Sequence, residues 1–194
     1  MQSINLLKSV GVIELERAYE KCLMWFYAFP NSRVSLTVLA NSIRSSKTAT
    51  KLAVEKLTKE GFIYKEIIGK AWLLCLAPSH IYSITRKMPY HLNKIFESGV
   101  VDAVRKTIPQ SRAIILFGSY RWGSDDEKSD IDIAVQVLDK KEFSITWLGN
   151  LPELGYRKNV PVNLHVFSRN QIDSNLFANI ANGIILDGFL EVRP

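Results

Sequence analysis

Three segments in the first half of the chain repeat apolar residues every three or four positions, which predicts helices with one buried face. These segments are Glu14–Phe29, Thr37–Arg44 and Lys47–Glu60. Pro30 ends the first helix because it has no amide hydrogen to donate, and Gly61 is a common residue after a helix C-terminus. Two apolar runs follow, Phe62–Glu66 and Ala71–Leu76, and the short loop between them contains Gly69. That arrangement predicts a β-hairpin.

The second half of the chain changes to apolar strands that alternate with helical segments. Strands are predicted over Ala113–Phe117, Asp130–Val137 and Val160–Phe167. Helices are predicted over Tyr90–Phe96, Val100–Ile108, Glu142–Leu151 and Asn170–Asn182. Strands that alternate with helices indicate a sheet domain of the α/β or α+β type. We therefore predict an α+β fold in three parts: a helical unit with a hairpin at 1–78, a helical connector at 79–108, and a mixed sheet flanked by helices at 109–194.

The positive charge of the chain is concentrated in its first half. The 194 residues carry a net charge of +6. Up to Tyr90 there are 13 Lys and Arg against 6 Asp and Glu, whereas from His91 onward the two kinds nearly balance. A basic half favours a polyanionic partner such as nucleic acid, because Lys and Arg displace counterions from phosphates. The alternative is an ordinary solvated basic surface.

The composition argues against several classes of protein. Two cysteines are too few for a disulfide-stabilised toxin or growth factor. The longest run without a charged residue, Ala71–Thr85, contains Pro78 and has 15 residues, whereas a membrane-spanning helix needs about 20 apolar residues. The first residues lack the long apolar core of a secretory signal. These features predict a cytoplasmic protein without a membrane partner.

The first-half elements follow the order of a winged helix-turn-helix, which is helix, helix, short turn, helix and hairpin. The segment that most resembles this family reads LANSIRSSKTATKLAVEKLTKEGFI, and the resemblance covers Glu14–Leu76. It implies that the third helix enters the major groove of double-stranded DNA. The residues that would face DNA are Ser45, Ser46, Lys47, Thr48, Thr50 and Lys51, with Lys65 or Lys70 on the wing. Winged helices also serve as docking and dimerisation modules, so a homodimer is the alternative use of this unit.

Two acids in the second half stand in a pattern with chemical meaning. Asp130 and Asp132 are two residues apart in a predicted strand, so their carboxylates point to the same face, with Cα atoms about 6–7 Å apart. Neighbouring anions repel each other, and a cation between them removes that repulsion. Two carboxylates with open coordination positions suit Mg²⁺, which also takes phosphate oxygens. The pair alone is a weak signal, because acids also occur at strand edges as solvated charges.

A glycine upstream strengthens this argument. Gly118 and Ser119 directly follow an apolar strand, where the backbone can approach a ligand and offer amide hydrogens and a hydroxyl to phosphate. Gly118-Ser119, ten further residues and then Asp130-Ile131-Asp132 resemble the signature of polymerase-beta-type nucleotidyltransferases, the minimal nucleotidyltransferases in particular. The resemblance covers Ser111–Leu190. The sequence contains no Walker A loop, no GxGxxG fingerprint and no zinc-ligand spacing.

This resemblance implies transfer of a nucleoside monophosphate from ATP or another nucleoside triphosphate to an acceptor hydroxyl, with release of pyrophosphate. Asp130 and Asp132 would hold Mg²⁺ or Mn²⁺, and with Ser119 they would form the catalytic group. Gly118, Ser119 and Arg121 would bind the nucleotide phosphates. In relatives within this superfamily the acceptor is a protein, such as a partner toxin, or a small molecule.

The sequence departs from the family at two positions. The strand that should carry a third carboxylate reads VPVNLHV, so Asn163 occupies the expected Asp position. Its amide is neutral and cannot act as a carboxylate base. His165 lies two residues on, on the same strand face, where it either shares the base role or packs as an ordinary histidine. Trp122 stands where many relatives carry an arginine, directly before Gly123.

Two functions are compatible with these residues. The first, which the sequence favours, is a Mg²⁺-dependent nucleotidyltransferase coupled to a DNA-binding winged helix. The second is a DNA-binding regulator or antitoxin-like protein whose degenerate transferase domain senses nucleotide without turnover. It is motivated by Asn163, because the loss of one metal carboxylate weakens transition-state stabilisation. A structural partner within a toxin–antitoxin pair is a third, weaker alternative.

Overall fold

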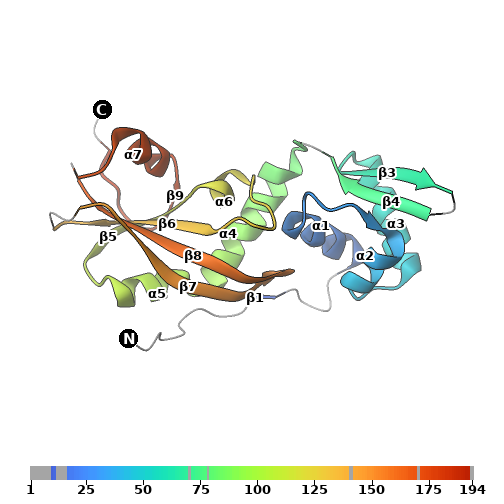
Figure 1. The fold of residues 1–194 in the computed structure, drawn as a ribbon, viewed down its shortest axis with the longest axis horizontal. Helices are drawn as coiled ribbons and strands as arrows, with labels where there is room; N and C mark the ends of the chain where they lie inside the picture. The colour runs from blue at the N-terminus through green and yellow to red at the C-terminus, as the bar shows by residue number, and fades with distance from the viewer. Residues whose placement is uncertain are drawn as a thin grey trace.

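The computed structural model describes residues 10–11, 17–69, 71–77, 79–139, 142–169 and 171–192. They form two units, a helical N-terminal unit with a small sheet and a second unit built on a larger sheet (Figure 1). The predicted α+β composition, with a mixed sheet and flanking helices, is confirmed. Within these ranges no helix combines the length and the apolar character needed to cross a lipid bilayer.

The N-terminal unit packs three helices against a three-stranded antiparallel sheet. Its elements are α1 (Ala18–Ala28), β2 (Val34–Ser35), α2 (Leu36–Ser42), α3 (Lys47–Lys59), β3 (Ile63–Ile68) and β4 (Ala71–Leu76), and its strands lie in the order β2-β4-β3. Ser35 begins α2 because its hydroxyl oxygen accepts a hydrogen bond from the amide of Val38. Ser46 begins α3 in the same way, with the amide of Ala49. The predicted helices and hairpin therefore form, and the second helix starts one residue before its predicted start.

The second unit is built on a six-stranded mixed sheet with the order β1-β7-β8-β6-β5-β9. Its strands are β1 (Val10–Gly11), β5 (Ser111–Phe117), β6 (Ile131–Val137), β7 (Ser144–Gly155), β8 (Arg157–Ser168) and β9 (Ile184–Gly188). Strand β6 lies at the centre, antiparallel to β5 and parallel to β8. Strands β5, β6 and β8 confirm the three predicted strands, whereas β1, β7 and β9 are additional.

Helices cover both faces of this sheet (Figure 1). On one face Ile131, Ile133 and Val135 form a core with α4 (Met88–Glu97), α5 (Val100–Thr107) and the short α6 (Ser119–Trp122). On the other face Ala134 belongs to a smaller core with α7 (Ser174–Ala181). Because strand residues alternate between faces, the even-numbered acid Asp132 lies on the α7 side.

The prediction of a helix over Glu142–Leu151 is wrong, because most of this segment belongs to strand β7. Phe143, Ile145 and Trp147 alternate with polar residues, and aromatic and β-branched residues favour strands. Strand β7 pairs with β8 from Ser144 to Leu154. The two strands, each of twelve residues, form a long antiparallel hairpin that joins the sheet to the N-terminal unit (Figure 1).

The connector begins with a π-helical turn, η1 (Ser83–Lys87), which the apolar periodicity does not predict and which continues into α4. This turn lies against the loop that follows α6. Gly123 in that loop has φ of +68°, and a Cβ there would lie 2.2 Å from the carbonyl oxygen of Ser83. Glycine is therefore required at this contact, because it has no Cβ and adopts positive φ without strain.

A buried charge cluster joins the connector to the same loop. Lys87 Nζ lies 3.3 Å from one carboxylate oxygen of Asp125, and His91 Nδ1 lies 3.3 Å from the other. All three residues are almost completely buried. Burial lowers the pKa of Lys87 below its ordinary value, and the neighbouring carboxylate partly opposes this shift. Removing one partner of such a pair is costly, because the other charge stays in the interior uncompensated.

We expect Lys87→Met to destabilise the protein by about 3–5 kcal/mol, because Asp125 would lose its closest cation while remaining buried. Urea unfolding measures the change. Arg33→Met is the matched control, since Arg33 pairs with Glu66 at 2.6 Å but both side chains are more than half exposed. That exposed pair should contribute about 1 kcal/mol or less. Equal losses in the two variants would contradict this account.

Candidate functional site

Asp130 and Asp132 lie at the start of β6, directly after a turn that Asp126 shapes. The Asp126 carboxylate accepts hydrogen bonds from the amide of Lys128 at 2.9 Å and from the hydroxyl of Ser129 at 3.0 Å. These hydrogen bonds, that from Lys128 foremost, lower the pKa of Asp126. The turn therefore gives the chain a fixed direction as it enters β6, and the two acids follow on the α7 side of the sheet.

The register of the sheet places a row of side chains across this face. Asp132 is paired with Phe117 of β5 and with Asn163 of β8. Asn163 is in turn paired with Trp147 of β7. Directly paired residues share a face of the sheet, so all four side chains belong to one row. His165 lies two residues beyond Asn163 on the same face.

Gly118 brings the backbone against one of the acids. It has φ of +72°, and a Cβ there would lie 2.8 Å from Oδ2 of Asp132. Ser119, the first residue of α6, follows directly and is half-buried. The structure therefore brings together Gly118, Ser119 and the acid pair, which are the residues that the sequence singles out for phosphate and metal binding.

Each acid has a polar neighbour on β8. Asn163 Nδ2 donates a hydrogen bond to Oδ2 of Asp130 at 3.2 Å. His165 Nε2 lies 3.0 Å from Oδ1 of Asp132, and its ring packs edge-on against Phe117 with centroids 4.8 Å apart. Because an ionised carboxylate only accepts, the hydrogen of the neutral imidazole belongs on Nε2. The remaining nitrogen, Nδ1, is buried and has no hydrogen-bond partner among the described residues.

The oxygen atoms of this site suit a divalent cation with a reduced set of ligands. Asp130 and Asp132 offer carboxylates on one face, and Mg²⁺ and Mn²⁺ prefer such donors. Asn163 presents its NH₂ group to Asp130, so its carbonyl oxygen would have to turn inward to become a ligand. Within the described ranges, no group of three or more His, Cys, Asp and Glu side chains is placed to hold a metal ion. The two acids therefore offer two carboxylates to a cation, and Asn163 stands where the resemblance predicts a third.

Arg121, which the sequence analysis assigns to phosphate binding, lies on α6 and is already engaged. Its Nε donates to the carbonyl oxygen of Asn182, just after α7, at 3.0 Å. Its guanidinium carbon lies 4.4 Å from the ring centre of Trp122, which is mostly exposed. Trp122, directly before Gly123, thus provides a flat surface for the Arg121 guanidinium. The nitrogens of Arg121 other than Nε are the ones that can contact a phosphate.

Trp147 is the residue of this face that the sequence analysis missed. It lies opposite Asn163 and is 59% exposed, which is unusual for a tryptophan in a sheet. Its Nε1 donates to Oδ1 of Asn150 at 3.2 Å. The signal that could have identified it is the alternation of Phe143, Ile145 and Trp147, which is typical of a strand.

The residues predicted to face DNA lie in the turn before α3 and in its first turns, and they differ in exposure. The exposed ones are Ser46, Lys47, Thr48 and Lys51, and Ser45 is half-buried. Thr50 is fully buried, and its hydroxyl donates to the carbonyl oxygen of Ser46 at 2.9 Å. Thr50 therefore faces the core and is not available to DNA.

Two lysines flank Trp72 near the loop of the β3–β4 hairpin. Lys51 Nζ lies 5.4 Å from the ring centre and Lys65 Nζ lies 4.2 Å from it. Both distances are within cation–π range, so the ring holds the two positive charges close together. The basic side chains of α3 and of the hairpin therefore form one continuous surface here. Lys70, the other residue predicted on the wing, lies outside the described residues.

Comparison with known proteins concerns the second unit. A family model described as "Polymerase beta, Nucleotidyltransferase" matches residues 101–186, from α5 into β9. Protein adenylyltransferase MntA of Shewanella oneidensis is 36% identical over 56 residues, which is 29% of this chain and 40% of that protein. The chain therefore spans less than half the length of this curated relative. The N-terminal unit lies outside the family match, whereas Gly118, Ser119, Asp130, Asp132 and Asn163 lie within it.

We expect Gly118→Ala to destabilise the protein more than Gly69→Ala in urea unfolding. Both glycines have positive φ, +72° and +61°, which costs other residues about 1–2 kcal/mol, and Gly118, with ψ of −154°, lies in a region nearly confined to glycine, where the cost is at least as large. Only at position 118 does the added methyl group meet a neighbour, the carboxylate of Asp132, whereas nothing lies within 4 Å at position 69. We expect an additional loss of about 1 kcal/mol or more. Equal losses would show that the carboxylate does not crowd Gly118.

Proposed function

We propose that this chain is a Mg²⁺-dependent nucleotidyltransferase that moves a nucleoside monophosphate from a nucleoside triphosphate to an acceptor. One observation carries the proposal, the close approach of Gly118 to Asp132, because it puts a backbone turn beside two carboxylates on one face. The family match over residues 101–186 supports it, since the description of that family names nucleotidyl transfer.

In this proposal the Gly118–Ser119 turn binds the triphosphate. The two backbone amides and the Ser119 hydroxyl donate hydrogen bonds to the β- and γ-phosphates. Asp130 and Asp132 hold the cation, which when bound neutralises the phosphates and polarises the α-phosphorus. Arg121 adds positive charge through the nitrogens that Asn182 does not occupy.

The acceptor is proposed to lie on the β7 side of the acids. Trp147 and Asn163 border the acids there, and the exposed indole offers a flat apolar surface to an incoming group. The relative that matches part of this chain is named a protein adenylyltransferase. We therefore propose ATP as the first donor to test and a protein hydroxyl as the first acceptor, with a small molecule as the second.

A second candidate function rests on the contacts that Asn163 and His165 of β8 make with the two acids. Asn163 is not a base, and His165 has its Nε2 at Asp132 and its Nδ1 buried, so neither takes a proton from an acceptor in this arrangement. A domain that binds nucleotide at the turn and the acids but transfers it very slowly would have these properties. In that case the chain is a regulator or antitoxin-like protein that senses nucleotide.

For the N-terminal unit we propose a winged helix-turn-helix that binds double-stranded DNA. The order of α1, β2, α2, α3, β3 and β4 and the Ser46 cap before α3 support it, as do the exposed Lys47 and Lys51. The domains would then be 1–78 for DNA, 79–108 as connector and 109–194 for the nucleotide. A docking or dimerisation surface is the alternative use of this unit.

Incubation with radiolabelled ATP and a candidate acceptor in the presence of Mg²⁺ tests the transfer. We expect Asp130→Ala with Asp132→Ala to lower label transfer by at least about a hundredfold, because the cation would lose both carboxylates. Asp102→Asn changes an exposed acid on α5 and should leave transfer unchanged. Label transfer that persists in the double variant would contradict the proposal.

Asn163→Asp separates the two candidate functions in the same assay. If the chain is a transferase, the new carboxylate should raise a measurable rate by about tenfold or more, since it restores the third ligand. If it is a sensor, the wild-type chain should bind ATP in calorimetry but transfer no label. Only the Asn163→Asp variant should then show label transfer.

We expect duplex DNA of random sequence to bind the chain in a salt-sensitive manner. Lys47→Ala with Lys51→Ala should weaken binding and reduce the slope of log K against log salt by about two, because each lysine neutralises one phosphate. Lys106→Ala, an exposed lysine of α5, is the control and should change neither quantity. Fluorescence anisotropy over a range of salt concentrations measures both. Failure of any duplex to bind at low salt would exclude the DNA proposal.

A further inference from the structure

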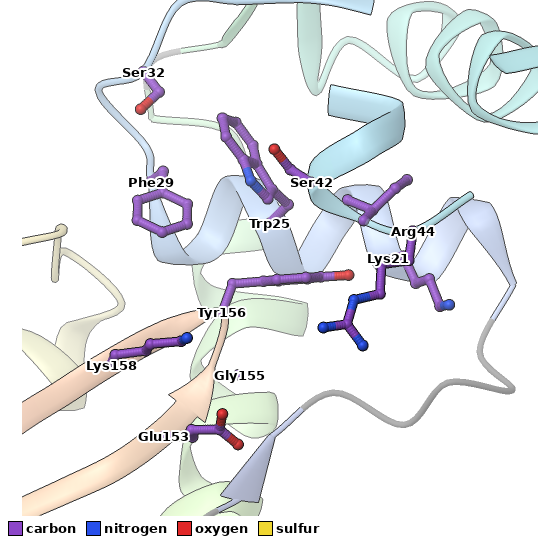
Figure 2. Close-up of a pocket in the computed structure, with 11 residues that line it drawn as sticks. Lys21, Trp25, Phe29, Ser32, Ser42, Arg44, Glu153, Gly155, Tyr156 and Lys158 are labelled. Atoms are coloured by element: carbon purple, nitrogen blue, oxygen red, sulfur yellow. The ribbon is translucent and has the colours of Figure 1, made fainter. Parts of the chain in front are cut away.

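The two ends of strand β8 differ in how their polar side chains are grouped. At the hairpin end a cleft of about 630 Å³ lies between the two units, and Figure 2 shows Lys21 and Lys158 at its opposite ends, so these charges do not meet at one point. His165 lies seven residues beyond Lys158, which is about 23 Å along an extended strand. There the polar groups do converge, because Asn163 and His165 both contact the acid pair.

The imidazole of His165 is placed for one polar contact. Its Nε2 lies 3.0 Å from Oδ1 of Asp132, whereas its Nδ1 is buried and has no hydrogen-bond partner among the described residues. A buried polar atom without a partner has a cost that an apolar side chain avoids. The ring centres of Phe117 and Phe143 lie 4.8 Å and 6.0 Å from that of His165, so these surroundings suit an apolar residue as well. Packing alone therefore does not account for a histidine at this position.

The same contact distinguishes the two oxygens of Asp132. Oδ1 faces His165, while Oδ2 lies on the side of Gly118, 2.8 Å from the place that a Cβ of this glycine would occupy. The terminal torsion of an aspartate is broad, so a hydrogen-bond donor on one oxygen determines where the other oxygen points. His165 therefore directs Oδ2 toward the turn that begins at Gly118.

The contact is more shielded from water on the histidine side than on the acid side. The side chain of His165 is 13% exposed and that of Asp132 is 28% exposed. A hydrogen bond in such surroundings is stronger than one at the open surface, and the exposed part of Asp132 remains accessible to a cation. Asn163 makes the corresponding contact with Asp130, from Nδ2 to Oδ2 at 3.2 Å. Two donors of β8 thus hold one oxygen of each acid.

We propose that His165 is a positioning residue, whose Nε2–H fixes the orientation of Asp132 for a divalent cation. The inference rests on the function proposed above, because it concerns the cation that Asp130 and Asp132 would hold. Hydrogen bonds to metal-ligating groups orient those groups, and their loss lowers metal affinity by about 10–100-fold. Asn163 stands where the resemblance predicts a third carboxylate, and here the two β8 donors orient the two remaining acids instead.

Binding of Mn²⁺ alone to the full chain, without nucleotide, tests the inference, and the electron paramagnetic resonance signal of free Mn²⁺ measures it. We expect His165→Leu, which removes the donor, to weaken Mn²⁺ binding by about tenfold or more. His165→Gln should bind within about threefold of the wild type, because the glutamine Nε2 is a donor as many bonds from Cα as the histidine Nε2. His165→Asn should bind as weakly as His165→Leu, because its amide is one bond shorter and does not reach Asp132.

Label transfer with Mg²⁺ gives a second readout. The His165→Leu variant should need a higher Mg²⁺ concentration than the wild type to reach half of its maximal rate. His80→Leu is the matched control, since it makes the same change in the N-terminal unit, where His80 Nε2 lies 3.1 Å from the carbonyl oxygen of Glu60. This control should bind Mn²⁺ as the wild type does. If His165→Leu does not fold, the comparison of His165→Gln with His165→Asn still decides the outcome.

Wild-type or tighter Mn²⁺ binding in both the leucine and the asparagine variant overturns the inference. Equal weakening by all three substitutions indicates a structural role of the ring and overturns it as well. Asp130→Ala with Asp132→Ala should abolish the binding and thereby locate it. Binding that needs the two acids but not His165 overturns the positioning role and leaves the proposed transferase standing. Binding that survives the loss of both acids overturns the cation site itself and the inference with it.

Discussion

The repulsion between two carboxylates on one strand is the constraint around which the second unit is arranged. Asp130 and Asp132 share a face of β6, and each is held by a neutral or basic group of β8, the amide of Asn163 and the imidazole of His165. An aspartate in place of Asn163 would add a third negative charge and remove a hydrogen-bond donor. The hydrogen bond from Asn163 and the contact with His165 thus each place a polar group beside one of the two carboxylates.

The strand order explains why the chemically active groups meet. Strands β5 and β6 are antiparallel, so the end of β5, where Gly118 follows, lies next to the start of β6, where the acids stand. Strands β6 and β8 are parallel and in register, which places Asn163 beside Asp132. The short α6 then leads from the glycine to the loop that the connector holds through Gly123 and Lys87. One continuous set of contacts therefore links the candidate phosphate turn to the N-terminal unit.

The sequence predicts an element clearly when the apolar residues of that element are buried. The apolar residues of β5, β6 and β8 are buried. A continuous apolar run predicts β5, whereas apolar residues at every second position predict β6, β8 and the shared face of the acids. Strand β7 is largely exposed over its first half, so its apolar signal is weak and the position of Trp147 depends on pairing with a distant strand. Burial of Thr50, in contrast, follows from the sequence. Thr50 lies three residues before Ala53 and four before Val54, which are both buried, so the helical period alone places it in the core. The contact of His165 with Asp132 depends on register, which the sequence does not specify.

The β7–β8 hairpin has a mechanical consequence. Gly155 and Tyr156 form its turn, Trp147 and Asn163 are a pair three positions from its open end, and backbone pairing runs along most of the length between them. Paired strands of this kind resist stretching along their length, and the register shift between Trp147 and Gly149 is where the regular ladder is interrupted. Tyr90 of α4 lies at this turn, so close to Gly155 that a Cβ there would lie 2.6 Å from the Tyr90 hydroxyl. The turn of the hairpin is therefore braced from two sides, by strand pairing and by helix α4.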